Sequence, residues 1–247
     1  MNKKNLITLL FLPIVGFGQN TLLFSEYGEG TGWNKWVEIY NPTLSNISLD
    51  DYRYNFCWNG CDNLEWEFSI PFDSGFVLLP NETYLLAHNN ADSILLDAAN
   101  QTTNILSNGN DVIGLLNITL DTIVDIIGIF DSTNVTAWNV NGVSNATKDH
   151  ILIRKPNVCE GNFGDWYLSN GSSVPSQWII GFLDDFNYIN YHNSKCFNST
   201  SNEVVHTQKR TLIEVKDLLG RTSTIKNNQL LLYIYDDKTI EKKMIIE

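Results

Sequence analysis

Basic residues are scarce in this chain, and their scarcity excludes one class of partner. The 247 residues include 28 Asp and Glu but only 16 Lys and Arg, which gives a formal net charge of -12 at pH 7. Residues 19–203 hold 22 of the acidic residues and only six of the basic ones. A surface with this charge repels phosphate groups, so the composition argues against binding to DNA or RNA.

Long hydrophobic runs are also missing after the N-terminus. The most apolar candidate, residues 112–130, contains Asn117, Asp121 and Asp125. An amide and two charged side chains are too costly to expose to lipid, and we therefore expect no transmembrane span.

The N-terminus has the pattern of a secretory signal peptide. Lys3 and Lys4 precede an apolar run, and small residues follow at the -3 and -1 positions before Gln19. We predict a signal peptide over residues 1–18, with cleavage between Gly18 and Gln19. The alternative is an uncleaved anchor. It is disfavoured because the run contains a proline and is shorter than the roughly 20 residues that span a bilayer.

Motifs of the common catalytic and metal centres are absent from the sequence. The chain has no Gly-x-Ser-x-Gly turn and no glycine-rich phosphate loop, and its four His follow no zinc-ligand spacing. Glu26 and Glu38 could form a paired-carboxylate acid–base site, because they fall on neighbouring predicted strands. We favour the alternative that these carboxylates accept backbone N–H bonds at the rim of a sheet, and we predict no enzymatic activity.

Four cysteines in an exported chain allow three disulfide pairings. Their spacing favours Cys57–Cys61 together with Cys159–Cys196. A three-residue hairpin loop, with Gly60 in the left-handed region, would bring Cys57 and Cys61 opposite each other at a distance that a disulfide accepts. We predict these two disulfides.

Short β-rich runs separated by turn residues dominate the chain as far as residue 182. This pattern is typical of an antiparallel β-sandwich. Only residues 91–102 suggest a helical turn or two, and the polar residues 197–210 lack strand alternation and indicate a linker. The predicted strands lie within residues 22–27, 36–42, 64–70, 76–79, 83–88, 112–116, 122–129, 150–154 and 178–182.

Five short segments resemble those of a known family, both in their residues and in their order along the chain. They read SEY at residues 25–27, WVEIYNP at 36–42, PNETYLLA at 80–87, NGNDVIGL at 108–115 and VDIIG at 124–128. Together they resemble the lamin tail domain family. Residues 148–155 and 184–188 are similar to closing segments of secreted bacterial members of that family.

The resemblance covers roughly residues 20–193 and implies an immunoglobulin-like antiparallel β-sandwich, which we place at residues 19–196. The chain departs from the family pattern in the Cys57–Cys61 loop and in an insertion at residues 138–142. The family is defined by a scaffold and not by a catalytic residue set, so the resemblance implies a fold and no reaction.

A second resemblance lies at the C-terminus. Residues 212–221 read LIEVKDLLGR, residues 231–238 read LLYIYDDK, and a further strand-like run follows at 240–247. These segments are similar to the C-terminal sorting tail of type IX secretion substrates in Bacteroidetes. The resemblance implies a sorting tail over residues 211–247 and the type IX machinery as a partner. The alternative is that these strands extend the sandwich.

Two acidic clusters offer the hard oxygen ligands that calcium prefers. They are Asn110 with Asp111, and Asp184 with Asp185. Neither follows the EF-hand spacing, and turn chemistry explains such residues equally well. We expect no cofactor, with calcium as the alternative.

Tryptophans at predicted loops and strand ends are candidates for a surface that binds sugar or peptide. They are Trp33, Trp58, Trp66 and Trp138, and the alternative is that they belong to the core.

The sequence thus predicts a secreted or cell-surface protein without enzymatic activity, whose role is adhesion or ligand binding. The expected ligand is a surface glycan or a protein. One enzymatic alternative stays open, because bacterial lamin-tail modules accompany secreted nucleases and phosphatases. The chain would then be an extracellular hydrolase or an accessory module of such a system.

Overall fold

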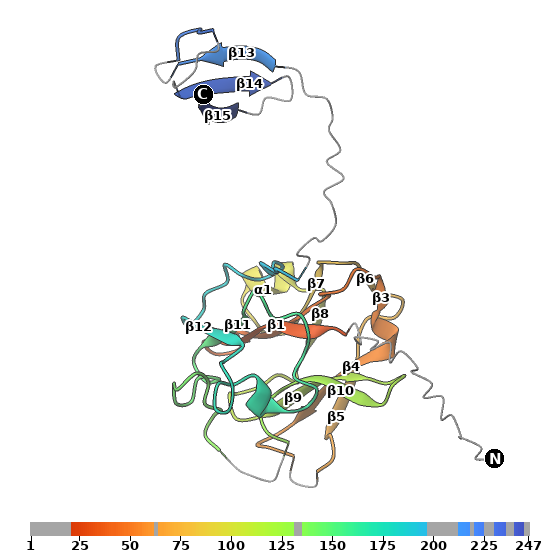
Figure 1. Ribbon diagram of the computed structural model, residues 1–247. Helices are drawn as coiled ribbons and strands as arrows, with labels where there is room; N and C mark the ends of the chain where they lie inside the picture. Colours follow the sequence, from red (N-terminus) through yellow and green to blue (C-terminus); the bar gives the residue numbers. More distant parts are fainter. Residues whose placement is uncertain are drawn as a thin grey trace, which may run out of the picture. The chain divides into compact units, whose positions relative to one another are not determined.

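The computed structural model describes residues 21–61, 64–130, 135–196, 212–217, 220–224, 230–235 and 240–244 (Figure 1). The chain divides into two compact units, Met1–Phe197 and Asn198–Glu247. The predicted signal peptide, its cleavage point and the predicted linker at 197–210 lie outside the described residues.

The first unit is an all-β sandwich, as predicted, and Figure 1 shows its six-stranded sheet above its four-stranded one. Neighbouring strands are antiparallel except for one parallel pair, β7 with β8. The six-stranded sheet has the order β12 (Trp178–Gly181), β11 (Ile151–Arg154), β1 (Leu23–Glu29), β2 (Lys35–Tyr40), β7 (Thr83–His88) and β8 (Gln101–Thr103). The four-stranded sheet has the order β10 (Thr122–Ile127), β9 (Val112–Asn117), β4 (Tyr52–Cys57) and β5 (Phe68–Pro71).

Smaller elements complete this unit. The helix α1 (Ser93–Ala98) falls inside the segment predicted to be helical, and it lies over the outer face of the six-stranded sheet (Figure 1). The strands β3 (Ile47–Ser48) and β6 (Val77–Leu78) form a short pair of their own. Two 3-10 turns, η1 (Leu49–Asp51) and η2 (Trp166–Leu168), occupy connections.

Alternation along the strands builds the main core between the two sheets. In β2, Val37 and Ile39 belong to this core, whereas Trp36 belongs to a second cluster on the outer face of the sheet. Successive side chains of a strand point to opposite faces, so β2 is buried on both sides. The second cluster forms because α1 and residues 186–189 pack against that outer face.

A buried ion pair joins the two sheets. Asp125 of β10 and Arg154 of β11 have fully buried side chains, and the Arg154 Nη2 donates to the Asp125 Oδ2. Asp125 also accepts the backbone N–H groups of Phe24, at 2.9 Å, and Asn162, at 3.0 Å. The Arg154 Nε donates to the Phe24 carbonyl at 2.9 Å. Because every charged group is hydrogen-bonded, the pair fixes how the sheets meet.

Both predicted disulfides are confirmed, Cys57–Cys61 and Cys159–Cys196. The predicted three-residue hairpin around the first is wrong. Cys57 ends β4, whose hairpin partner β5 begins only at Phe68. The disulfide therefore closes a tight turn at the start of a longer connection. Gly60 has a φ of 99°, so it does take the left-handed conformation that the turn requires.

The second unit is a separate antiparallel sheet in the order β13 (Leu212–Lys216), β14 (Leu230–Tyr235) and β15 (Ile240–Met244). Val215, Leu231 and Tyr233 form its own small buried cluster. Three strands with one apolar face are about the minimum for independent stability.

Each strand predicted for the sandwich overlaps an observed one, but β3, β4 and β8 were not predicted. In the described parts of the chain, no helix combines the length and the hydropathy needed to cross a membrane.

Candidate functional site

Glu26 and Glu38 lie directly opposite each other on the adjacent strands β1 and β2. They share the outer face of the six-stranded sheet with Trp36, and their exposed fractions are only 1% and 0%. The prediction that the two carboxyls are neighbours is therefore confirmed. Their expected place at the rim of a sheet is wrong, because β1 and β2 are inner strands of the six-stranded sheet. The expected hydrogen bond from a backbone N–H is found at Glu38.

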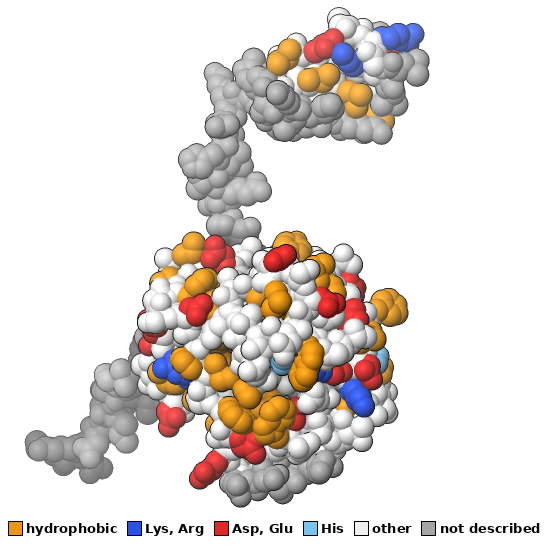
Figure 2. All heavy atoms as spheres, turned by 180° about the vertical axis from the view of Figure 1, so that it is seen from behind, with side chains coloured by type: hydrophobic (Ala, Val, Ile, Leu, Met, Phe, Trp, Pro, Cys, Tyr) orange, Lys and Arg blue, Asp and Glu red, His pale blue; other side chains and the backbone are white. Residues whose placement is uncertain are grey.

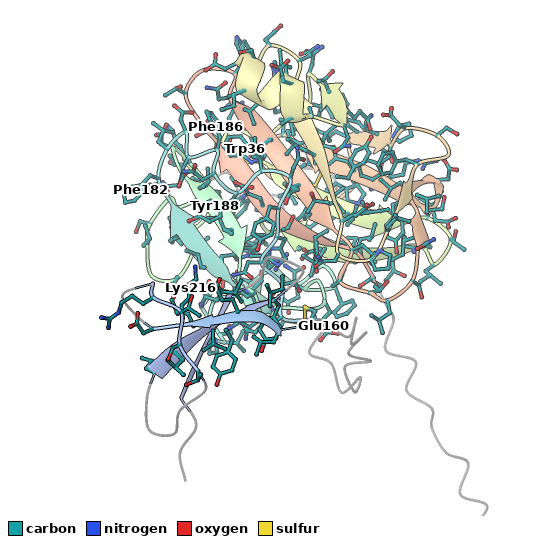
Figure 3. All side chains as sticks on the ribbon, turned by 90° about the horizontal axis from the view of Figure 1, so that it is seen from above. Trp36, Glu160, Phe182, Phe186, Tyr188 and Lys216 are labelled. Carbon is teal, nitrogen blue, oxygen red and sulfur yellow. A yellow bond between two sulfur atoms is a disulfide. The ribbon has the colours of Figure 1, made fainter. Side chains whose placement is uncertain are left out.

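The segment 182–192 covers this face. Phe186 packs on the Trp36 indole with ring centroids 5.3 Å apart, and Figure 3 shows the two rings side by side. Ile189 joins the same cluster. The Asn190 backbone N–H donates to the Glu38 Oε2 at 2.5 Å. Phe182 lies at the periphery in Figure 3 and is 84% exposed. The segment thus has one anchored stretch and one open end.

The two carboxyls differ in how they are satisfied. Glu38 accepts the Ser25 hydroxyl at 2.6 Å on Oε1, in addition to the Asn190 N–H on Oε2. Both oxygens of Glu26 are buried and have no hydrogen-bond partner among the described residues. The Trp36 indole N–H is near enough to oppose the rise in the pKa of Glu26, but it does not reach hydrogen-bonding geometry.

Burial controls the charge of this pair. It raises the pKa of Glu26 well above the ordinary value, and the nearby charges of Glu38 and Asp185 raise it further. Burial also raises the pKa of Glu38 to about 7, against the lowering effect of Ser25 and Asn190. Two like charges are unfavourable side by side without solvent, so burial and the charge of Glu38 both favour the protonated form of Glu26. A carboxyl that titrates near 7 suits a general base, but Glu38 has no exposed surface through which to meet a substrate.

A groove of about 410 Å³ opens beside this covered face. Its walls come from residues 81–83 at the start of β7, from Asn100 after α1 and from residues 190–192. Asn190 belongs to both features, since its backbone N–H donates to Glu38 and it is one of the residues that line the groove. The volume is within the roughly 300–1,000 Å³ of small-molecule sites.

The first calcium candidate is a turn. The Asp111 Oδ1 accepts the Asn59 N–H at 2.9 Å, and its Oδ2 accepts the Asn108 N–H at 2.7 Å. The Asn110 side-chain amide donates to the Asn59 side-chain oxygen at 2.6 Å. Asp111 thereby ties its own turn, which precedes β9, to the turn closed by Cys57 and Cys61.

The second calcium candidate also binds its own protein. The Asp184 carboxylate accepts the Thr31 N–H at 3.0 Å and the Thr31 hydroxyl at 2.7 Å. Asp185 accepts from the side chain and the N–H of Asn187. Over the part of the chain that the structure describes, no three His, Cys, Asp or Glu side chains gather as metal ligands.

The four candidate tryptophans occupy different environments. Trp33 is 56% exposed and stacks on His88 with centroids 4.5 Å apart. Trp138 is in the core, where its indole N–H donates to the Asp111 carbonyl at 2.8 Å. Trp58 and Trp66 are half-buried against other aromatic rings. The four therefore do not form one exposed surface.

Figure 2 shows a further face of the first unit, on which acidic side chains are scattered among hydrophobic ones. This distribution agrees with the excess of Asp and Glu in the sequence.

Several residues of this region were not singled out from the sequence. Asn190, Tyr191 and His192 follow the last strand of the sandwich and lie in irregular backbone, where no periodic pattern marks them. The positive φ of Asn190 and Asn81, 60° and 65°, is compatible with asparagine, but one asparagine alone does not predict it.

No protein-family model, curated protein or solved structure matches this chain.

Proposed function

We propose that this chain is an exported binding protein, in which the sandwich of residues 19–196 recognises a surface glycan or a protein and catalyses no reaction. One observation carries the proposal. The carboxyl pair best suited to acid–base chemistry is covered, whereas the adjacent groove, with its amide and aromatic side chains, is open to solvent. The side chains that a ligand could reach are therefore suited to binding it, and the carboxyl pair suited to catalysis is out of its reach.

Export is supported by the cysteines and by the N-terminal pattern. Both disulfides lie within the first unit, and such bonds persist in oxidising compartments. We further propose, on the resemblances alone, that the sandwich is a lamin tail domain. Residues 211–247 would then direct the protein through type IX machinery to the surface of a Bacteroidetes cell. The compactness of the second unit is compatible with such a tail.

An extracellular hydrolase is the second candidate, and the pKa of Glu38 near 7 is the observation that favours it. For Glu38 to act, the segment 182–192 would have to leave the sheet. That movement would break the Asn190–Glu38 hydrogen bond and expose Trp36 and Phe186 to water. Burial of these aromatic side chains opposes the movement.

The experiment compares binding with turnover. Mature protein is applied to arrays of bacterial surface glycans and extracellular proteins. In parallel it is incubated with nucleic acid, phosphoesters and polysaccharides, with calcium, magnesium or zinc added in turn. We expect binding on the arrays and no turnover above buffer. Turnover that disappears in a folded Glu38→Gln variant would establish the hydrolase instead.

A further inference from the structure

The groove beside the carboxyl pair presents hydrogen-bonding groups that the protein leaves unused. The Asn81 side-chain oxygen accepts the Tyr40 hydroxyl at 2.7 Å, and the Asn100 side-chain oxygen accepts the Leu85 N–H at 2.8 Å. Each amide therefore keeps its oxygen occupied, and its NH₂ group has no partner in the described part of the chain. Two residues that line the groove therefore carry unused donors.

Acceptors lie among these donors. The Asn190 NH₂ group is bound to the Ala98 carbonyl at 2.9 Å, which leaves its oxygen free. One oxygen of Glu82 accepts the Leu79 N–H at 3.1 Å, and the other has no partner among the described residues. The protein's own hydrogen bonds fix the orientation of all four side chains, so little conformational entropy would be lost on binding.

His192 supplies an independent observation. It lines the groove, is 5% exposed and packs edge-on against Tyr40 with centroids 4.7 Å apart. Its buried Nε2 has no hydrogen-bond partner in the described residues. Burial and, to a smaller extent, the charge of Arg154 together lower the pKa of His192 to about 4. The imidazole is thus neutral at physiological pH. A buried ring nitrogen without a partner costs free energy unless a ligand or water satisfies it.

The aromatic ring of Tyr191 and the negative charge of Glu82 limit the kinds of ligand that the groove could bind. Tyr191 lines the groove and is 62% exposed, which offers an apolar face with a hydroxyl at its edge. Glu82 and the net charge of -12 repel anions. The ligand should therefore be uncharged, should both donate and accept hydrogen bonds, and should carry an apolar face.

We propose that the groove formed by Asn81, Glu82, Asn100, Asn190, Tyr191 and His192 binds a neutral saccharide. Its hydroxyls would bond to the free NH₂ groups and acceptors, and its C–H face would lie on Tyr191. This inference rests on the proposed binding function and names its ligand class and its site.

The test is saturation-transfer NMR on the full mature protein, because this method detects millimolar binding. The probes are neutral mono- and oligosaccharides of glucose, galactose, mannose, xylose and N-acetylglucosamine. Glucuronate and galacturonate oligomers serve as anionic counterparts, and a pool of short peptides represents the other ligand class. We expect transfer to at least one neutral saccharide that exceeds transfer to its anionic counterpart.

Variants locate the site. Tyr191→Ala should weaken saccharide binding about tenfold, whereas Tyr191→Phe, which keeps the ring, should stay close to the wild type. Asn100→Asp keeps the acceptor for Leu85 but removes the NH₂ donors, and it should weaken binding about threefold or more.

The matched controls lie outside the groove. Tyr167→Ala removes an exposed ring on η2, and Asn139→Asp alters an amide whose oxygen likewise accepts a backbone N–H. Both should bind like the wild type, and thermal melting confirms that each variant is folded.

Three outcomes would overturn the inference. They are transfer to no neutral saccharide, a preference for the peptides or the anionic sugars, or saccharide binding that survives in the Tyr191→Ala, Asn100→Asp double variant. If that double variant still binds the glycan or protein arrays, the proposed function stands and only the groove is wrong. If the wild type binds nothing on the arrays, the proposed function fails as well.

Discussion

The six-stranded sheet buries charged residues on both of its faces, and the two faces treat them in opposite ways. Toward the four-stranded sheet, Asp125 meets Arg154, and hydrogen bonds satisfy both groups. On the outer face Glu26 meets Glu38, a like group, and Glu26 has no hydrogen-bond partner in the described residues. Opposite charges meet at the first place, whereas burial opposes charge at the second.

The Asp125–Arg154 pair is thus a structural lock between the two sheets, whereas the Glu26–Glu38 pair is a site whose pKa values are shifted by burial. The guanidinium of Arg154 also lies 3.8 Å from the ring centroid of Trp178, so its charge has a further favourable contact. In the carboxyl pair, hydrogen bonds satisfy Glu38 but not Glu26, so burial of the pair costs free energy. Groups that are buried at a cost often mark functional regions, and here the region adjoins the open groove.

Removing the Asp125–Arg154 ion pair should have the largest effect on the free energy of unfolding. Asp125→Ala leaves the Arg154 charge buried without a partner and orphans the N–H groups of Phe24 and Asn162. We expect a loss of about 3–5 kcal/mol in the free energy of unfolding, measured by urea denaturation. Asp97→Ala, an exposed change on α1, should stay within about 0.5 kcal/mol. Equal effects for the two variants would refute the role of the lock.

The two disulfides allow a second comparison of stabilising interactions, because both are covalent links within the first unit. Replacing Cys159 and Cys196 by serine opens a loop with a sequence separation of 37, which the chain-entropy model values at about 3–4 kcal/mol. Replacing Cys57 and Cys61 by serine opens a loop with a sequence separation of only 4 and should lower the free energy of unfolding by about 2 kcal/mol. Urea denaturation of the two double variants gives the order. A larger loss from the short loop would contradict it.

The raised pKa of Glu26 should make the free energy of unfolding depend on pH. In the unfolded chain Glu26 loses its proton near pH 4.5, whereas in the folded protein its raised pKa retains the proton to higher pH. The folded state therefore binds more protons above pH 4.5, and the stability due to this group falls as pH rises. Glu26→Gln removes this loss. The free energy of unfolding of the variant should match that of the wild type near pH 4 and should exceed it increasingly as the pH rises to 8.

The difference between variant and wild type is the right readout, because other groups titrate in the same range. The lowered pKa of His192 makes the folded state bind fewer protons between about pH 4 and 6.5, so its stability contribution rises there. Urea denaturation at pH 4, 6 and 8 separates the two effects. A constant difference between Glu26→Gln and wild type would show that Glu26 is not perturbed.

The smallest effect on the sandwich should come from removing the second unit. Residues 212–244 contain their own sheet and buried cluster, so deletion of residues 211–247 should leave the melting temperature of the first unit unchanged. In a host with type IX machinery, the truncated protein should stay in the periplasm. Fusion of residues 197–247 to a periplasmic reporter should carry the reporter outward. An unfolded truncated protein would show that the sandwich depends on the second unit, and a retained reporter would show that residues 197–247 are not a sorting signal.

Local alternation explains how much of the fold was predictable. Strands such as β2 and β7 carry strong β-forming residues, and two consecutive strands placed Glu26 beside Glu38 without further information. The strand β4 was missed although Tyr52, Tyr54 and Phe56 alternate with polar residues, a signal that was present in the sequence.

Long-range pairing explains what was not predictable. Arg154 reaches an aspartate 29 positions away, and Asn190 reaches Glu38 across 152 positions. These contacts depend on the register and on the path of an irregular covering segment, neither of which has a local signature. The groove shares this origin, because residues 81–83, Asn100 and residues 190–192 meet only after folding.

One NMR sample tests binding without catalysis most directly. The full mature protein is mixed with the neutral oligosaccharide that gives the strongest saturation transfer, and the anomeric signals of the sugar are followed over several days at pH 7. We predict sustained saturation transfer with no new reducing-end signals, because Glu38 stays covered while the groove stays open. New reducing-end signals that vanish in folded Glu38→Gln would contradict the account and make the covered pair a catalytic site.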